Sequence, residues 1–198
     1  MFSNIKTLFA AFLLVAATGA NATVITHESR SFTGNIDADL ATYWETLAPG
    51  TVHELDAVGS LRPGNRKVNL LNVEFSAGAT SVWDLQFAVD ATYGAAIYLD
   101  GVEIVSRTDD LWWQNDWNNG DVLYVSDLIV NPGSHDLQVF WAERCCNGSN
   151  QFRIIDQRTG TVAPLSVSSI NAATVSEPAG LALVALGALA LVRGRRTK

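Results

Sequence analysis

The sequence predicts an all-β fold, an antiparallel β-sandwich, for the central part of the chain. Short apolar or alternating segments recur between residues 68 and 155, with turn signals about every ten residues, and this spacing is typical of a sandwich. Asp100-Gly101 separates two apolar runs and is the strongest short-range signal for a tight hairpin. No long segment with helical periodicity lies between the two ends of the chain, which argues against a helical or α/β fold.

Each predicted strand follows from the side-chain period of two. In the segment 82–89, Trp83, Leu85 and Phe87 share one face, which we assign to the core. The segment 135–142 alternates in the same way before a polar turn reverses the chain. The expected strands are 68–75, 82–89, 95–99, 102–105, 122–130, 135–142 and 151–155.

The first 22 residues have the three parts of a secretory signal peptide. Lys6 supplies a positive charge, residues 8–17 form a short apolar run, and Ala20 and Ala22 supply the small-residue cleavage site. The apolar run is too short to act as a membrane anchor. We therefore predict a signal-peptide helix over 1–22, cleavage after Ala22, and export of the rest of the chain.

The last segment, 176–198, combines an apolar run at 179–192 with a basic end at 193–198. As a helix this run would rise about 21 Å, which is less than the roughly 30 Å hydrocarbon core of a bilayer. The basic end would stay on the cytoplasmic side. This pattern predicts a short hydrophobic helix that is held in the inner membrane transiently, and an ordinary tail anchor is the alternative.

The segment between the two ends is strongly acidic. Residues 23–176 contain eight Lys or Arg and nineteen Asp or Glu, a formal charge of about −11. Nucleic-acid binding is excluded, because it needs cationic side chains that neutralise phosphates. The charge suits solubility outside the cell, cation binding or a neutral glycan partner. We expect one sandwich domain over 23–160, followed by a Ser/Thr-rich spacer over 161–175, and we interpret the residues 159–174 at this boundary as a last strand plus a flexible spacer.

An unusual hairpin tip follows the strand 135–142. It contains the chain's two cysteines, Cys145 and Cys146, and a polar turn with Asn147 and Asn150, which we name as candidate ligand-binding residues. The cysteines could form a ring between neighbours, pair between chains or stay free. A ring would force the peptide between them out of its relaxed geometry. It could rigidify a binding tip, or it could only shape the turn.

Three tryptophans lie on a polar loop at 109–119. Trp112, Trp113 and Trp117 could form a stacking platform, because aromatic faces pack well on the apolar faces of sugars. The alternative is that two of the three tuck into the edge of the sandwich.

Nothing in the sequence selects a catalytic centre. It has no Gly-x-Ser-x-Gly motif, no triad order and no metal motif, although its many carboxylates leave a glycosidase as an alternative. Calcium needs six to eight oxygen ligands. Asp109, Asp110 and Asp116 could supply some of them, and a solvated acidic loop is the alternative. We therefore predict a non-enzymatic protein with no cofactor other than a weak candidate calcium site.

The C-terminal segment resembles the PEP-CTERM sorting signal of Gram-negative bacteria, which has a Pro-Glu-Pro motif, an apolar helix and an Arg-rich end. Here the motif reads Ser176-Glu177-Pro178, so the first proline is replaced. The basic end holds Arg193, Arg195 and Arg196. The resemblance implies recognition, and cleavage, by the membrane enzyme exosortase.

The block 85–154 resembles the PA14 superfamily, and within it the fibro-slime branch. The matching motifs are the Asp-Gly hairpin of 96–105, the Pro-Gly strand of 131–140, and the Phe-Trp-Ala-Glu-Arg…Gly-Ser-Asn-Gln-Phe-Arg-Ile segment of 140–154. The insert 145–148, Cys-Cys-Asn-Gly, resembles the CCXG family of PEP-CTERM proteins. The PA14 resemblance implies a two-sheet sandwich with a carbohydrate-binding or adhesive role.

In PA14 lectins two adjacent aspartates chelate the calcium ion that holds the sugar hydroxyls. The corresponding position here reads Asp90-Ala91, so the second aspartate is missing and Asp90 is the remaining candidate ligand. We expect an exosortase-sorted protein of the cell surface or extracellular matrix that contacts the polysaccharide of a biofilm. The alternatives are a matrix-processing glycoside hydrolase and a purely structural matrix component.

Overall fold

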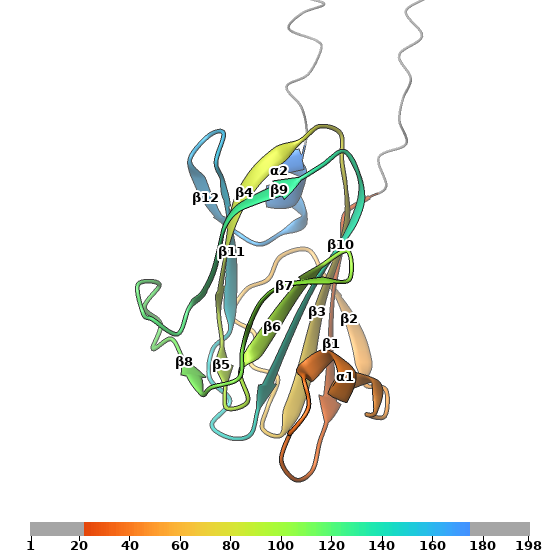
Figure 1. Ribbon diagram of the computed structural model, residues 1–198, viewed down its shortest axis with the longest axis vertical. Helices are drawn as coiled ribbons and strands as arrows, with labels where there is room; N and C mark the ends of the chain where they lie inside the picture. Colours follow the sequence, from red (N-terminus) through yellow and green to blue (C-terminus); the bar gives the residue numbers. More distant parts are fainter. Residues whose placement is uncertain (1–21, 175–198) are drawn as a thin grey trace, which may run out of the picture.

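A computed structural model describes residues 22–174, and these form two antiparallel sheets packed face to face (Figure 1). The larger sheet has the strand order β2-β1-β3-β10-β6-β7 and the smaller has the order β12-β11-β4-β9, with β5 and β8 as a separate pair. The strands are β1 (Val24–Ser31), β2 (Thr51–Leu55), β3 (Lys67–Ala77), β4 (Ser81–Ala88), β5 (Asp90–Ala91), β6 (Ala95–Leu99), β7 (Val102–Arg107), β8 (Leu111–Trp112), β9 (Leu123–Val130), β10 (Gly133–Glu143), β11 (Gln151–Asp156) and β12 (Thr161–Pro164). The predicted antiparallel β-sandwich is confirmed.

The predicted terminal segments lie outside the described residues. These are the signal-peptide helix before residue 22 and the sorting segment 176–198 with its apolar run at 179–192. Within residues 22–174, no helix is both long and apolar enough to cross a membrane.

The core lies between the two sheets. Alternation along β10 directs Trp141 inward, where its ring lies 5.4 Å from that of Phe152 on β11, measured between centroids. Trp83 and Phe87 of β4 are also fully buried, as their shared face predicts. Burial of such large aromatic side chains supplies much of the hydrophobic stabilisation of a sandwich.

A short helix explains why both faces of β10 are apolar at its end. Helix α1 (Leu40–Glu45) covers the outer face of the larger sheet and packs Trp44 against Phe140, with 6.0 Å between the ring centroids. Asp39 caps this helix by accepting a hydrogen bond from the backbone N–H of Thr42 at 2.9 Å. Phe140, which alternation places opposite the core, is therefore buried as well.

The segment 161–175, predicted as a flexible spacer, differs in the structure. Its first residues form β12, which pairs with β11, and helix α2 (Val167–Thr174) follows. Leu165 and Ile170 are fully buried in the main core. Strand β12 agrees with the expected last strand, whereas 165–174 is not a flexible spacer, because Leu165 and Ile170 close one end of the sandwich although the surrounding composition is typical of a linker.

The described chain enters and leaves at the same end of the sandwich (Figure 1). The Thr23 hydroxyl donates a hydrogen bond to Asn171 Oδ1 at 2.6 Å, which joins the start of the first strand to the last helix. Strand β10 starts at this end and runs antiparallel to β3 until Glu143 pairs with Lys67. The tip that follows Glu143 therefore lies at the opposite end.

Candidate binding site at the hairpin tip

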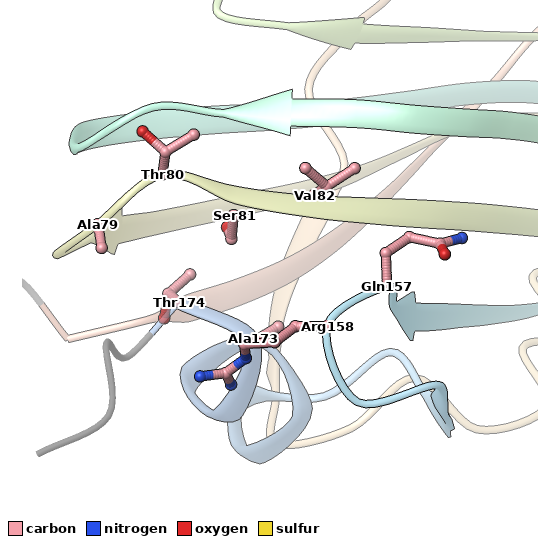
Figure 2. A pocket seen from close by; sticks show the side chains of 8 residues that line it. All are labelled: Ala79, Thr80, Ser81, Val82, Gln157, Arg158, Ala173 and Thr174. Atoms are coloured by element: carbon pink, nitrogen blue, oxygen red, sulfur yellow. The ribbon is translucent and has the colours of Figure 1, made fainter.

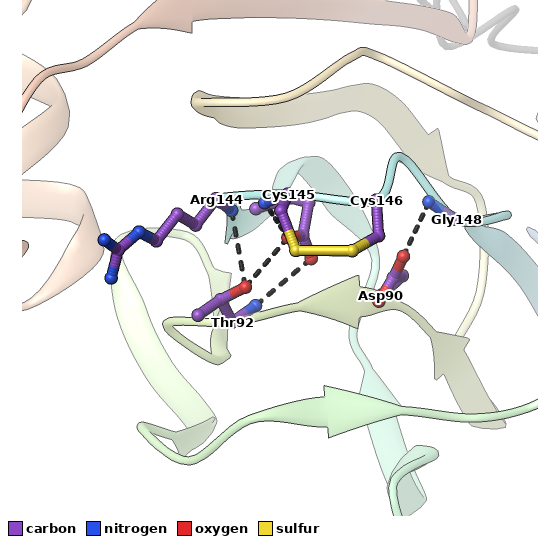
Figure 3. Close-up of a disulfide and its surroundings, with 7 residues drawn as sticks. Asp90, Thr92, Arg144, Cys145, Cys146 and Gly148 are labelled. Carbon is purple, nitrogen blue, oxygen red and sulfur yellow. Dashed lines mark hydrogen bonds between the residues drawn. A yellow bond between two sulfur atoms is a disulfide. The ribbon is translucent and has the colours of Figure 1, made fainter.

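The tip joins β10 to β11 and is exposed at its cysteines. The structure places a disulfide between Cys145 and Cys146, the ring between neighbours that was one of three alternatives (Figure 3). Cys146 and Asn147 have φ values of 79° and 46°. These are left-handed conformations that Asn tolerates well and that are uncommon for other residues. Gly148, in contrast, has no positive φ, so its presence needs another reason.

Glu143 fixes the start of the tip, residues 144–150, by accepting hydrogen bonds. Its Oε1 accepts hydrogen bonds from the Cys145 backbone N–H at 2.5 Å and from the Thr92 hydroxyl at 2.8 Å. Its Oε2 accepts from the Thr92 backbone N–H at 3.3 Å. The residue is only 3% exposed, and this burial raises the pKa of its carboxyl while the hydrogen bonds act in the opposite direction.

Asp90 holds the end of the tip in the same way. Its Oδ2 accepts a hydrogen bond from the Gly148 backbone N–H at 2.6 Å (Figure 3). A Cβ atom at Gly148 would lie 2.0 Å from that oxygen, so only glycine lets the backbone approach the carboxylate this closely. Burial raises the pKa of Asp90, and the bond from Gly148 partly offsets it. Glu143 and Asp90 together fix the Cys-Cys-Asn-Gly loop at both ends.

The two asparagines of the tip hydrogen-bond to the chain itself. Asn147 Oδ1 accepts from the Gly64 N–H at 2.7 Å, and Asn150 Oδ1 accepts from the Asp90 N–H at 2.8 Å. The amide of Asn150 also donates to the Leu61 carbonyl at 3.1 Å, and the residue is 2% exposed. Both predicted ligand-binding side chains therefore serve to attach the tip to its neighbouring loops.

The three tryptophans occupy three different environments. Trp113 is 2% exposed, and its indole N–H donates to the Ser149 carbonyl at 2.6 Å. Trp117 is half-buried, with its ring centroid 5.1 Å from that of Trp113, and the guanidinium of Arg153 lies 4.1 Å above it. Trp112 is 60% exposed. The structure thus buries one ring, half-buries the second and exposes the third, so the three rings do not form one exposed platform.

The residues around Asp90 do not fit the calcium ion of PA14 lectins. Asp90 is followed by Ala91 instead of the second aspartate that the resemblance implies, and the Asp90 carboxylate accepts a hydrogen bond from a backbone N–H. Asp109 forms an ion pair with Arg107, and Asp110 is exposed. Across residues 22–174, no group of three or more His, Cys, Asp or Glu side chains could hold a metal ion.

Two cavities differ in their position relative to the tip. One, of about 340 Å³, lies beside the tip and is lined by residues that include Trp117, Gln151 and Arg153. The other, of about 470 Å³, lies at the opposite end between the start of β4 and the end of α2 (Figure 2). Arg158, which lines the second cavity, already pairs with Asp156 at 3.4 Å.

The described chain has a PA14-like β-sandwich fold, as comparison with solved structures shows. A PA14 sugar-binding domain from an RTX adhesin superposes with a TM-score of 0.52 and 8% identity, over 75% of this chain and 97% of that one. The epithelial adhesin 9 A domain of Candida glabrata, in complex with Galβ1-4GlcNAc, superposes with a TM-score of 0.51 and 7% identity, over 73% and 90%. The PA14 domain of the MpAFP antifreeze protein gives 0.50 and 9%, over 73% and 87%. No protein-family model and no curated protein matches the sequence.

The carboxylate support of the tip gives a testable prediction. Glu143→Gln is expected to lower the free energy of unfolding by about 1–3 kcal/mol, because the amide NH₂ would face backbone N–H donors. The pH dependence should change too. A raised pKa means that the folded state holds this proton more tightly, so stability falls as pH rises above the ordinary glutamate pKa of about 4.3.

Urea unfolding across a pH series measures both effects. The slope of stability against pH should be shallower in Glu143→Gln but still present, because burial also raises the pKa of Asp90 and Asp136. Glu54→Gln, at an exposed residue of β2, is the matched control and should change neither quantity. An unchanged slope in Glu143→Gln would contradict the assigned role.

Proposed function

We propose that the chain is an exported, non-enzymatic module that binds carbohydrate or adheres to it at the cell surface or in the extracellular matrix. The observation that carries the proposal is the fold likeness to PA14 domains, one of which is a sugar-binding domain of an adhesin. Two further features support it: the disulfide, which is typical of exported proteins, and the half-buried Trp117 beside a cavity.

We also propose that the two ends direct the protein to this location. The signal-peptide pattern ending at Ala22 supports export, and Glu177-Pro178 with the apolar run and Arg193 supports sorting by exosortase in a Gram-negative bacterium. Mass spectrometry of the native protein tests this proposal. New ends after Ala22 and near Pro178 are expected, and an intact full-length mass would overturn it.

The glycosidase alternative gains no support from the carboxylates at the tip. Asp90 and Glu143 interact electrostatically with each other, as a catalytic pair would, but each accepts hydrogen bonds from the backbone of the loop. Glu143 is also almost completely buried. A general acid or a nucleophile needs access to the glycosidic bond, so this pair is better suited to holding the loop.

The proposal is tested by incubating the purified chain with an array of immobilised polysaccharides. Retention on a subset of glycans is expected, without release of reducing ends during prolonged incubation. Release of reducing ends would favour the hydrolase. Retention on none of the glycans would favour a structural matrix component. Because the Asp90-Ala91 position does not fit calcium, retention should be the same in EDTA.

A further inference from the structure

The outer face of the smaller sheet carries a row of polar and aromatic side chains next to the cavity beside the tip. Strand register aligns Tyr124 of β9, Gln86 of β4 and Arg153 of β11 across three neighbouring strands. Alternation along β11 directs Phe152 into the core and Arg153 outward. Trp117 reaches this face from the tryptophan loop and lies against the Arg153 guanidinium.

Arg153 has no carboxylate partner within residues 22–174. Its Nε donates a hydrogen bond to the neutral Gln86 Oε1, and its guanidinium contacts the ring of Trp117. Partial burial lowers the pKa of Arg153, because removing water from the guanidinium disfavours its charged form and no carboxylate compensates for it. The arginines that do form ion pairs are Arg30 with Glu28, Arg107 with Asp109 and Asp121, and Arg158 with Asp156.

The geometry selects the kind of group that would complete this site. Because Nε is taken by Gln86, the two terminal nitrogens of the guanidinium remain to bind a ligand. Two parallel N–H donors match the two oxygens of a planar carboxylate. The adjoining cavity of about 340 Å³ is within the usual range for small-ligand sites. It also presents Gln151 and Ser60, which can hydrogen-bond to hydroxyl groups, and Trp117, whose indole can pack against a sugar ring with the part that the Arg153 guanidinium does not cover.

We propose that this cavity binds a uronate residue of an extracellular polysaccharide, with Arg153 pairing its carboxylate and Trp117 packing on its ring. The inference rests on the proposed function and names the ligand class. The site does not include Asp90, where the PA14 resemblance implies a calcium ligand, and it needs no metal ion. The ligand proposed here is anionic, whereas the negative net charge of the domain suggested a neutral glycan. The difference arises because Arg153 supplies a local positive charge on this face.

Titration calorimetry of the purified chain in EDTA tests the assignment with three matched probes. These are a galacturonate oligosaccharide, the same oligosaccharide with its carboxyl groups reduced to hydroxymethyl groups, and a sulfated galactan oligosaccharide. The uronate should bind about ten- to a hundredfold more tightly than the reduced form. Equal affinity for the reduced probe would overturn the proposal, and equal affinity for the sulfated probe would overturn the uronate assignment.

Variants separate the site from the fold. Arg153→Gln should lose most of the preference for uronate, and Arg153→Lys should retain part of it, because lysine keeps the charge without the planar pair of donors. Arg144→Gln is the matched control, since Arg144 is exposed and its side chain points away from the tip (Figure 3). Unfolding curves establish that each variant is folded. Uronate binding unchanged in folded Arg153→Gln would overturn the site, whereas retention on no glycan in the array would overturn the proposed function itself.

Discussion

Replacing Trp141 with alanine is expected to lower the free energy of unfolding by about 3–5 kcal/mol. Its side chain is 0% exposed and lies where the two sheets meet, against Phe152 on one side. The ring of His27 stacks on it from the neighbouring part of the larger sheet, with 5.6 Å between centroids. Truncation would leave a cavity that surrounding strands, fixed by their hydrogen bonds, cannot close. Urea unfolding monitored by circular dichroism measures the loss.

Trp141→Phe is the matched control for this prediction. The indole N–H of Trp141 has no hydrogen-bond partner within residues 22–174, so phenylalanine removes a buried unsatisfied donor while it keeps most of the packing. The expected loss is below about 1.5 kcal/mol. If the alanine and phenylalanine variants were equally stable, packing of the ring between the sheets would not be a main source of stability.

Replacing Gly148 with alanine is expected to lower the free energy of unfolding by about 2–3 kcal/mol. The new methyl group would meet the Asp90 carboxylate at 2.0 Å and its Cβ at 2.7 Å, so the whole side chain would have to move. That movement would break the hydrogen bond from the tip backbone to Asp90. Chemical denaturation measures the effect, and hydrogen exchange should show faster exchange of amides in the tip.

Two further variants identify the cause of this effect. Gly120→Ala is the control, because no atom lies within 4 Å of the position of its Cβ, and it should change stability by less than about 0.5 kcal/mol. In the double variant Gly148→Ala with Asp90→Gly the clash is removed, because the Cβ of residue 90 is lost together with its carboxylate. Its destabilisation should therefore be smaller than the sum of the two single effects. Strict additivity would show that contact with Asp90 is not the reason for glycine at this position.

The strand pattern was predictable from the sequence because a half-buried strand repeats every two residues. The alternation at 82–89 correctly assigned Trp83, Leu85 and Phe87 to the core. The pattern did not predict the burial of side chains that are covered by a helix rather than by the opposite sheet. Phe140 is covered by helix α1, which is only six residues long, and Leu165 is buried beside helix α2. Such short helices have too few residues to show a period of 3.6.

The candidate site was predictable in location but not in its contacts. Cys145 and Cys146 marked the tip, and the turn residues indicated the chain reversal. The supports of the tip, Asp90 and Thr92, lie more than fifty residues earlier and meet it only through the tertiary fold. Arg153 gave a weaker signal: a charged residue between two apolar ones in a strand predicts an outward side chain, but its lack of an acidic partner is visible only in three dimensions.

The placement of the first strand and the last helix has a consequence for how the domain is presented. The chain enters and leaves the sandwich beside the contact between Thr23 and Asn171. If the domain were attached to a surface through the residues before or after it, this end of the sandwich would face that surface. The tip with Cys145 and Cys146 would then lie at the opposite end of the sandwich, about one strand length from that surface. Large polymers could reach it there without steric obstruction.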